Sequence, residues 1–208
     1  LNTFLATAGA VLAWSAVEWA LRGHASMLGA ASGAVAGLVA ITPAAGNVGV
    51  MGALIIGVLA GVVCFWGVSG LKRLLKADDT LDVFACHGVA GIMGAVLTGV
   101  FASKAVNPIG ADGLLHGNPS LVGIQVLAVV ATVAFAGTAS FGILSALKLV
   151  MPLRIRVDAE VQGIDLAEHG EEAYHGSDLS DLTGRRTALG DAVVLSASDL
   201  KRSAARRA

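Results

Sequence analysis

Five long apolar stretches, separated by short polar loops, make up the first 150 residues of the chain. An α-helix needs roughly 20 residues to cross the hydrocarbon core of a bilayer. The pattern therefore predicts an all-α membrane protein with five transmembrane helices, of which the second is short and the fifth is long enough to tilt or protrude. The predicted helices cover about residues 1–21, 26–41, 48–71, 80–102 and 120–150.

Small residues recur every four positions along most of these stretches. In the fourth stretch, Gly91, Ala95 and Gly99 form one such row, and the second, third and fifth stretches carry comparable rows. Small side chains let the backbones of neighbouring membrane helices approach closely. The rows therefore predict close helix-to-helix packing.

Charge is distributed very unevenly along the chain. The chain is 55% hydrophobic and 14% charged, which is unlike an ordinary soluble domain, and 18 of its 29 charged residues lie in the last 58 positions. The change in composition near Met151 predicts the end of the membrane part. Residues 151–176 are predicted to form a cytoplasmic C-terminal segment, and residues 177–208, rich in Asp, Ser, Ala and Arg, to be largely disordered. A net charge of −1 suggests no nucleic-acid partner.

The basic residues of the loops predict the orientation of the chain. Arg22, the cluster from Lys72 to Lys76, and Arg154 with Arg156 follow the first, third and fifth stretches, whereas the other loops hold only Lys104. Basic loops of membrane proteins lie on the cytoplasmic side. The C-terminus is therefore predicted to be cytoplasmic.

His87 is the single ionisable side chain within the apolar part of the fourth stretch, after Asp78, Asp79 and Asp82 at its start. Carboxylates are favoured at a helix start by the free backbone amides and the helix dipole. Polar groups at membrane depth are costly and mark functional sites. We expect a histidine buried in a membrane helix, either as a site residue or as a neutral imidazole that bonds to a neighbouring helix and fixes packing.

Other candidate chemistry is weaker. Glu18 precedes Arg22 by four positions, a spacing at which an acid and a base pair on one helix face, so we interpret Glu18 as a paired interfacial carboxylate rather than part of a transport pathway. Cys64 and Cys86 lie within apolar stretches, where a thiol behaves as a small hydrophobic group. We predict no disulfide, no metal site and no cofactor. No nucleophile with a base and an orienting partner is recognisable, so no enzyme is predicted.

The fourth stretch also resembles a known family. It resembles the penultimate transmembrane helix of the ammonium transporters, the Amt/Mep/Rh family, and further likeness extends over residues 1 to about 176, including a cytoplasmic segment at residues 163–174. The residues that carry the likeness most specifically are Leu81-Asp82-Val83-Phe84-x-x-His87-Gly88-x-x-Gly91, Thr98-Gly99-x-Phe101-Ala102, Thr42-Pro43-Ala44-x-Gly46 and Gly163-Ile164-Asp165-Leu166-x-x-His169-Gly170.

The resemblance implies a fold of eleven helices in two inverted five-helix halves with a last long helix, and this chain corresponds to the seventh helix onward. Helices, a first pore histidine, a phenylalanine gate and a cation-recruitment site would then precede Leu1. By position, His87 matches the second pore histidine, Asp82 an acidic residue at the cytoplasmic start of its helix, and Val83 a residue lining the cytoplasmic side of the pore.

The function implied is transport of ammonium or ammonia across a bacterial inner membrane. The chain would be the C-terminal part of a homotrimeric transporter, with a regulatory PII-type protein as a possible partner at the cytoplasmic face. Two alternatives stay open: an ammonium sensor on the same scaffold, which needs a signalling domain longer than this tail, and a neutral-solute channel of unrelated fold.

Overall fold

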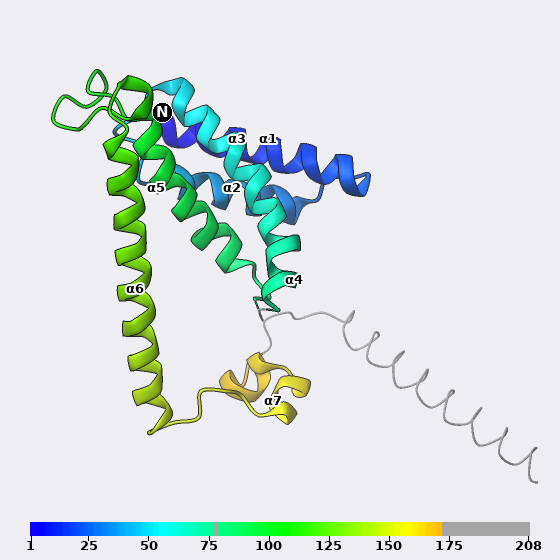
Figure 1. The fold of residues 1–208 in the computed structure, drawn as a ribbon. Helices are drawn as coiled ribbons and strands as arrows, with labels where there is room; N and C mark the ends of the chain where they lie inside the picture. Colours follow the sequence, from blue (N-terminus) through cyan, green and yellow to red (C-terminus); the bar gives the residue numbers. More distant parts are fainter. Residues whose placement is uncertain (77–78, 172–208) are drawn as a thin grey trace, which may run out of the picture. The chain divides into compact units, whose positions relative to one another are not determined.

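The computed structural model describes residues 1–76 and 79–171 (Figure 1). Within this part the chain is helical, and the predicted all-α class is confirmed. The only strand-like contact there is an isolated bridge between Val48 and Ala102. The elements are α1 (Asn2–Arg22), α2 (Met27–Ile41), α3 (Val50–Trp66), η1 (Gly67–Leu71), α4 (Lys72–Leu75), η2 (Phe84–Val89), α5 (Ala90–Phe101), η3 (Leu114–His116), α6 (Ser120–Lys148), α7 (Val157–Gln162) and η4 (Asp165–His169).

Four helical segments of the described residues are long and apolar enough to cross a membrane. They are Asn2–Arg22, Val50–Leu75, Phe84–Phe101 and Ser120–Lys148. The second of these joins α3, a π-helical turn η1 and α4 into one continuous helix of 26 residues. At 15 residues, α2 is shorter than a usual span, so the count of five transmembrane helices stays a prediction.

The helix that carries His87 begins later than the sequence pattern suggests. The pattern predicts a start at about Thr80, whereas the first helical residue is Val83. Asp82, just before it, has a left-handed backbone with φ of 56°, and a helix of L-residues cannot run through that conformation. Asp78 lies outside the described residues.

The packing of α1, α2 and α3 depends on close backbone approach at small residues. A Cβ added at Gly57 of α3 would meet the backbone of Ala6 in α1, and one at Gly94 of α5 would meet the backbone of Ala40 in α2. The predicted close packing is therefore confirmed for the rows of the second and third stretches. In the row of the fourth stretch, a Cβ added at Gly99 would meet the backbone of Val122, whereas one at Gly91 would meet only the side chain of Val39, at 3.8 Å. The buried core that results is made of Ala6, Ala10, Trp14, Ala36, Ala40, Ile41, Ala44, Val48, Ala53, Ile56, Ala60, Cys64, Phe65, Cys86 and Ala90.

Asparagine side chains join the loops at one end of these helices. Asn2 Nδ2 donates to the carbonyl oxygens of Ala45 (3.0 Å) and Val48 (2.8 Å). Asn107 Nδ2 donates to Asn47 Oδ1 at 2.8 Å. These bonds attach the start of α1 and the loop after α5 to the turn between α2 and α3.

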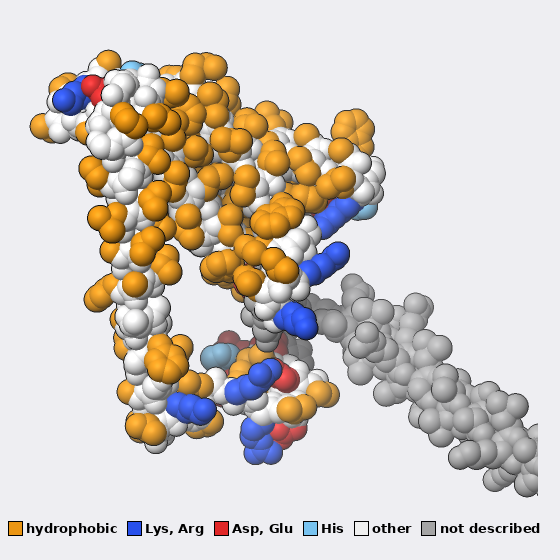
Figure 2. Space-filling model, viewed as in Figure 1, with side chains coloured by type: hydrophobic (Ala, Val, Ile, Leu, Met, Phe, Trp, Pro, Cys, Tyr) orange, Lys and Arg blue, Asp and Glu red, His pale blue; other side chains and the backbone are white. Residues whose placement is uncertain are grey.

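The chain divides into two compact units, residues 1–142 and 143–208. The division falls inside α6, and the predicted boundary between membrane and water near residue 150 stays a prediction. Within the first unit α6 has no buried residue, and Figure 2 shows hydrophobic side chains on the visible surfaces of its helices. In the second unit, Arg156 pairs with Asp158 at 2.8 Å beside the start of α7. The predicted disordered tail, residues 177–208, lies outside the described part.

Candidate functional site

His87 lies in η2, a π-helical turn that leads into α5. Its Nδ1 is 3.2 Å from the carbonyl oxygen of Val83, one turn earlier. Because a carbonyl oxygen only accepts hydrogen bonds, Nδ1 is the donor, and Nε2 of a neutral ring is left as an acceptor. Wide turns of this kind are frequent at functional sites in helices.

His87 is exposed in this chain, and its burial at membrane depth stays a prediction. The neighbours on the other faces of η2 are the buried ones. Ala85 lies against Gly67 of η1, and Cys86 Sγ approaches the carbonyl oxygen of Ser32 in α2 at 3.9 Å. Within the first unit, the described helices leave the face of η2 that carries His87 open.

Val83 is on this open side as well. It precedes His87 by four positions, and 51% of its surface is exposed. The structure therefore brings two of the three predicted site residues, His87 and Val83, into contact through a side-chain-to-backbone bond.

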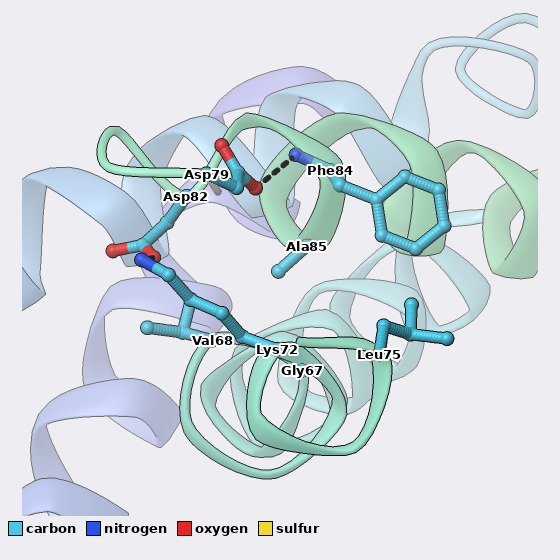
Figure 3. Close-up of a pocket in the computed structure, with 8 residues that line it drawn as sticks. All are labelled: Gly67, Val68, Lys72, Leu75, Asp79, Asp82, Phe84 and Ala85. Atoms are coloured by element: carbon cyan, nitrogen blue, oxygen red, sulfur yellow. Dashed lines mark hydrogen bonds and ion pairs between the residues drawn. The ribbon is translucent and has the colours of Figure 1, made fainter. Parts of the chain in front are cut away.

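Asp82, the third predicted site residue, has a different partner. Its Oδ1 is 2.9 Å from Nζ of Lys72 in α4, and the exposed fractions of the two side chains are 25% and 33% (Figure 3). The pair links the end of the helical segment Val50–Leu75 to the start of the segment Phe84–Phe101. Sequence reasoning treated Lys72 only as a loop charge that sets orientation, and it missed this contact.

Asp79 caps the helix of His87. Its carboxylate accepts hydrogen bonds from the backbone amides of Val83 and Phe84, both at 2.9 Å. Such bonds satisfy donors that have no partner within the helix. Three carboxylates were expected to favour this helix start, and the structure assigns the capping role to Asp79 and an ion-pairing role to Asp82.

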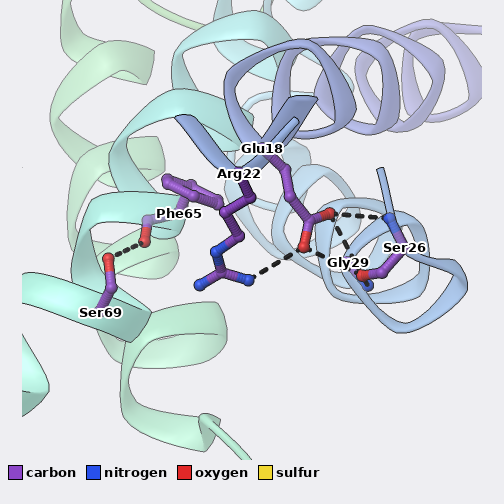
Figure 4. Close-up of polar contacts among 6 residues, drawn as sticks. All are labelled: Glu18, Arg22, Ser26, Gly29, Phe65 and Ser69. Carbon is purple, nitrogen blue, oxygen red and sulfur yellow. Dashed lines mark hydrogen bonds and ion pairs between the residues drawn. The ribbon is translucent and has the colours of Figure 1, made fainter. Parts of the chain in front are cut away.

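A second polar cluster joins α1 to α2 (Figure 4). Glu18 is 2% exposed and accepts from Arg22 Nη1 at 3.0 Å, from the Ser26 amide at 3.1 Å and from Ser26 Oγ at 3.0 Å. Ser26 Oγ in turn accepts from the Gly29 amide at 2.9 Å and caps α2. The interpretation of Glu18 as a paired carboxylate is confirmed.

A cleft of about 220 Å³ lies between α5 and α6. Its lining is uncharged and consists largely of small and branched side chains, so it offers packing surface rather than an ion site. It begins at Gly91, four positions beyond His87. The lining residues are Gly91, Ile92, Ala95, Ala128, Val129, Thr132 and Val133.

Comparison with known proteins gives one consistent family. The model of the Ammonium Transporter Family matches residues 1–174. An ammonium transporter of Bacillus subtilis is 47% identical over 177 residues, which cover 85% of this chain and 44% of that protein. Ammonium transporter Amt1 of Archaeoglobus fulgidus is 42% identical over 173 residues, which cover 83% of this chain and 43% of that protein.

Solved structures show the same likeness. Candida albicans Mep2 matches with a TM-score of 0.69 and 37% identity, over 76% of this chain and 36% of that one. A protein described as Sensor Amt Protein matches with a TM-score of 0.71 and 28% identity, over 80% of this chain and 40% of that one. The chain thus spans less than half the length of these relatives. With the family match covering residues 1–174, the chain belongs to the Ammonium Transporter Family.

Proposed function

We propose that this chain forms the last five helices of an ammonium transporter and supplies His87 to its conduction pathway. The observation that carries the proposal is the exposed imidazole of His87 on the capped helix of a chain that belongs to this family. Asp82 and Val83 stand beside it at the cytoplasmic end of the pathway. The partner helices, which a longer polypeptide would supply, cover the open face of η2.

The chemistry follows from the cost of moving charge. A bare ammonium ion is expensive to move through a dry pore, whereas neutral ammonia needs only hydrogen-bond partners. With Nδ1 bound to the Val83 carbonyl, Nε2 of His87 can accept an N–H from ammonia. His87 can therefore hold the neutral molecule by a hydrogen bond while the apolar walls exclude the cation.

The finer features belong to the same proposal. α2 crosses the membrane as a short span, the ends that carry Arg22 and Lys72 are cytoplasmic, and the C-terminal segment is cytoplasmic. The transporter is a homotrimer in a bacterial inner membrane, and a PII-type protein binds its cytoplasmic face. The mixed charges of residues 72–82 would affect how fast that partner associates, and which partner is selected, more than how tightly it binds.

A sensor of ammonium is the second candidate function. It is favoured by the likeness to the Sensor Amt Protein, which reaches a TM-score of 0.71 but only 28% identity. A sensor would bind ammonium without sustained flux. The neutral-solute channel of unrelated fold has no support from the family match.

The test uses the longer polypeptide that, by this proposal, contains residues 1–208 with the remaining helices, called here the parent protein. It is reconstituted in liposomes beside residues 1–208 alone, and methylammonium uptake is measured. We expect uptake by the parent protein and none by the fragment, whose small-residue surfaces lack partner helices. No uptake by the parent protein, with saturable methylammonium binding retained, would favour the sensor. Equal uptake by fragment and parent would refute the half-pore proposal.

A further inference from the structure

Lys72 places a primary ammonium group directly on the carboxylate of Asp82. Nζ and Oδ1 are 2.9 Å apart, and both side chains are mostly shielded from solvent. The ion pair is possible because η1 and η2 lie in close contact there, with a Cβ built at Gly67 only 3.1 Å from the Cβ of Ala85. Figure 3 shows the Lys72 side chain extending from its helix toward Asp82.

In the described part of the chain, Lys72 is the charged side chain that pairs with Asp82, and the neighbouring charged residues do not compete for it. The neighbouring carboxylate of Asp79 is occupied by the amides of Val83 and Phe84. Lys76, four residues after Lys72, is exposed and forms no ion pair among the described residues.

We propose that Lys72 is a specificity-determining residue whose tethered ammonium keeps free ammonium and potassium from being retained on Asp82. This inference rests on the proposed transport function. The head group of lysine and the ammonium ion carry the same charge and donate the same N–H bonds, so they compete for the same carboxylate oxygens. The tethered group has the advantage of a high effective concentration.

Without Lys72 the carboxylate is left partly buried and unpaired next to Val83. An unpaired carboxylate attracts free cations by its charge. A monovalent cation held there would stand beside the His87 pathway and slow the passage of substrate. Lys72 therefore acts through Asp82, as a positioning residue rather than a group that touches ammonia.

The test measures methylammonium uptake by the parent protein over a range of potassium concentrations. We expect Lys72→Met to lower the potassium concentration for half-inhibition about twofold, the size of one partly exposed ion pair. Lys72→Arg, which keeps the pair, and Lys76→Met, which removes the same charge nearby, should behave as the wild type. In an Asp82→Asn background, Lys72→Met should have no further effect.

Cation binding gives a readout that is independent of transport and of lost folding. Purified Lys72→Met protein, checked for monodispersity, should bind more radioactive rubidium at equilibrium than the wild type and the Lys72→Met/Asp82→Asn double variant. Equal rubidium binding and equal potassium inhibition in wild type and Lys72→Met would overturn the inference. Absence of uptake by the wild type would count against the proposed function, and the rubidium assay would still decide the role of Lys72.

Discussion

Two carboxylates of this chain each pair with a cation where two helical segments meet, yet their surroundings differ. Glu18 is 2% exposed and accepts from Arg22 and from both polar groups of Ser26. Asp82 has a side chain that is 25% exposed and one charged partner, Lys72. The first carboxylate is fully enclosed by its own junction, whereas the second is accessible beside an open helix face.

This difference separates a structural ion pair from one that can take part in function. When a partner of an enclosed charge is removed, the other polar groups of the cluster lose a hydrogen-bond partner and remain buried, which destabilises the fold. Removing a partner of an accessible charge leaves a group that water and ions reach, so its effect on stability is small. We therefore expect the ion pair of Glu18 to affect folding stability and the ion pair of Asp82 to affect which cations the transporter admits.

The largest expected effect is the loss of Glu18. Glu18→Ala leaves the Ser26 amide and hydroxyl without their acceptor and should lower the free energy of unfolding by about 2–4 kcal/mol. Thermal unfolding of the parent protein in detergent measures this. Asp112→Ala is the matched control, because that carboxylate holds a single loop amide, from Lys104, and should cost about 1 kcal/mol. An equal decrease in the free energy of unfolding in both variants would show that the burial of Glu18 does not increase its contribution to stability.

Substitution of His87 tests the accessible side of the comparison. His87→Ala removes the acceptor proposed for ammonia and should lower methylammonium uptake about tenfold, equivalent to one hydrogen bond of roughly 1.4 kcal/mol, or admit potassium. His116→Ala is the control, since His116 is an exposed loop histidine. If His87→Ala keeps both uptake and potassium exclusion, His87 has only a packing role.

The cap of the His87 helix should have an intermediate effect. Asp79→Ala removes the acceptor of two backbone amides and should lower the free energy of unfolding by about 1 kcal/mol. Asp79→Asn retains a capping oxygen and should lower it less. Hydrogen exchange of the peptide that contains Val83 and Phe84 should accelerate in Asp79→Ala. Unchanged exchange there would mean that the cap does not hold the helix start.

The all-α class was predictable from sequence because long apolar runs leave few alternatives to helix. The predicted 26–41 and the observed α2, Met27–Ile41, differ by one residue, since Ser26 caps the helix. The three residues between the predicted start at about Thr80 and the observed start at Val83 have a physical reason. Composition cannot say which of several neighbouring Asp residues turns back to cap the helix and which adopts a left-handed backbone.

The candidate site was only partly predictable. His87 and Val83 follow from the motif and its spacing, but the exposure of His87 depends on which helices are present. The contact of Asp82 with Lys72 depends on the approach of η1 to η2 at Gly67, a tertiary feature that no local pattern encodes. The proposed roles of Asp82, Val83 and His87 in transport stay predictions.

The smallest expected effect concerns the energy of the Lys72–Asp82 pair itself. A double-mutant cycle with Lys72→Met and Asp82→Asn should give a coupling in unfolding free energy of about 0.5 kcal/mol, within the range of partly exposed pairs. The coupling should fall further in 1 M salt, where the screening length is only about 3 Å. Thermal unfolding of the parent protein measures each corner of the cycle. The matched cycle with Arg22→Met and Glu18→Gln should give a larger coupling that salt changes little, because Glu18 is enclosed. A strong, salt-independent coupling at Lys72–Asp82 would make that pair structural, like Glu18, and would remove the physical basis for its exchange with free cations.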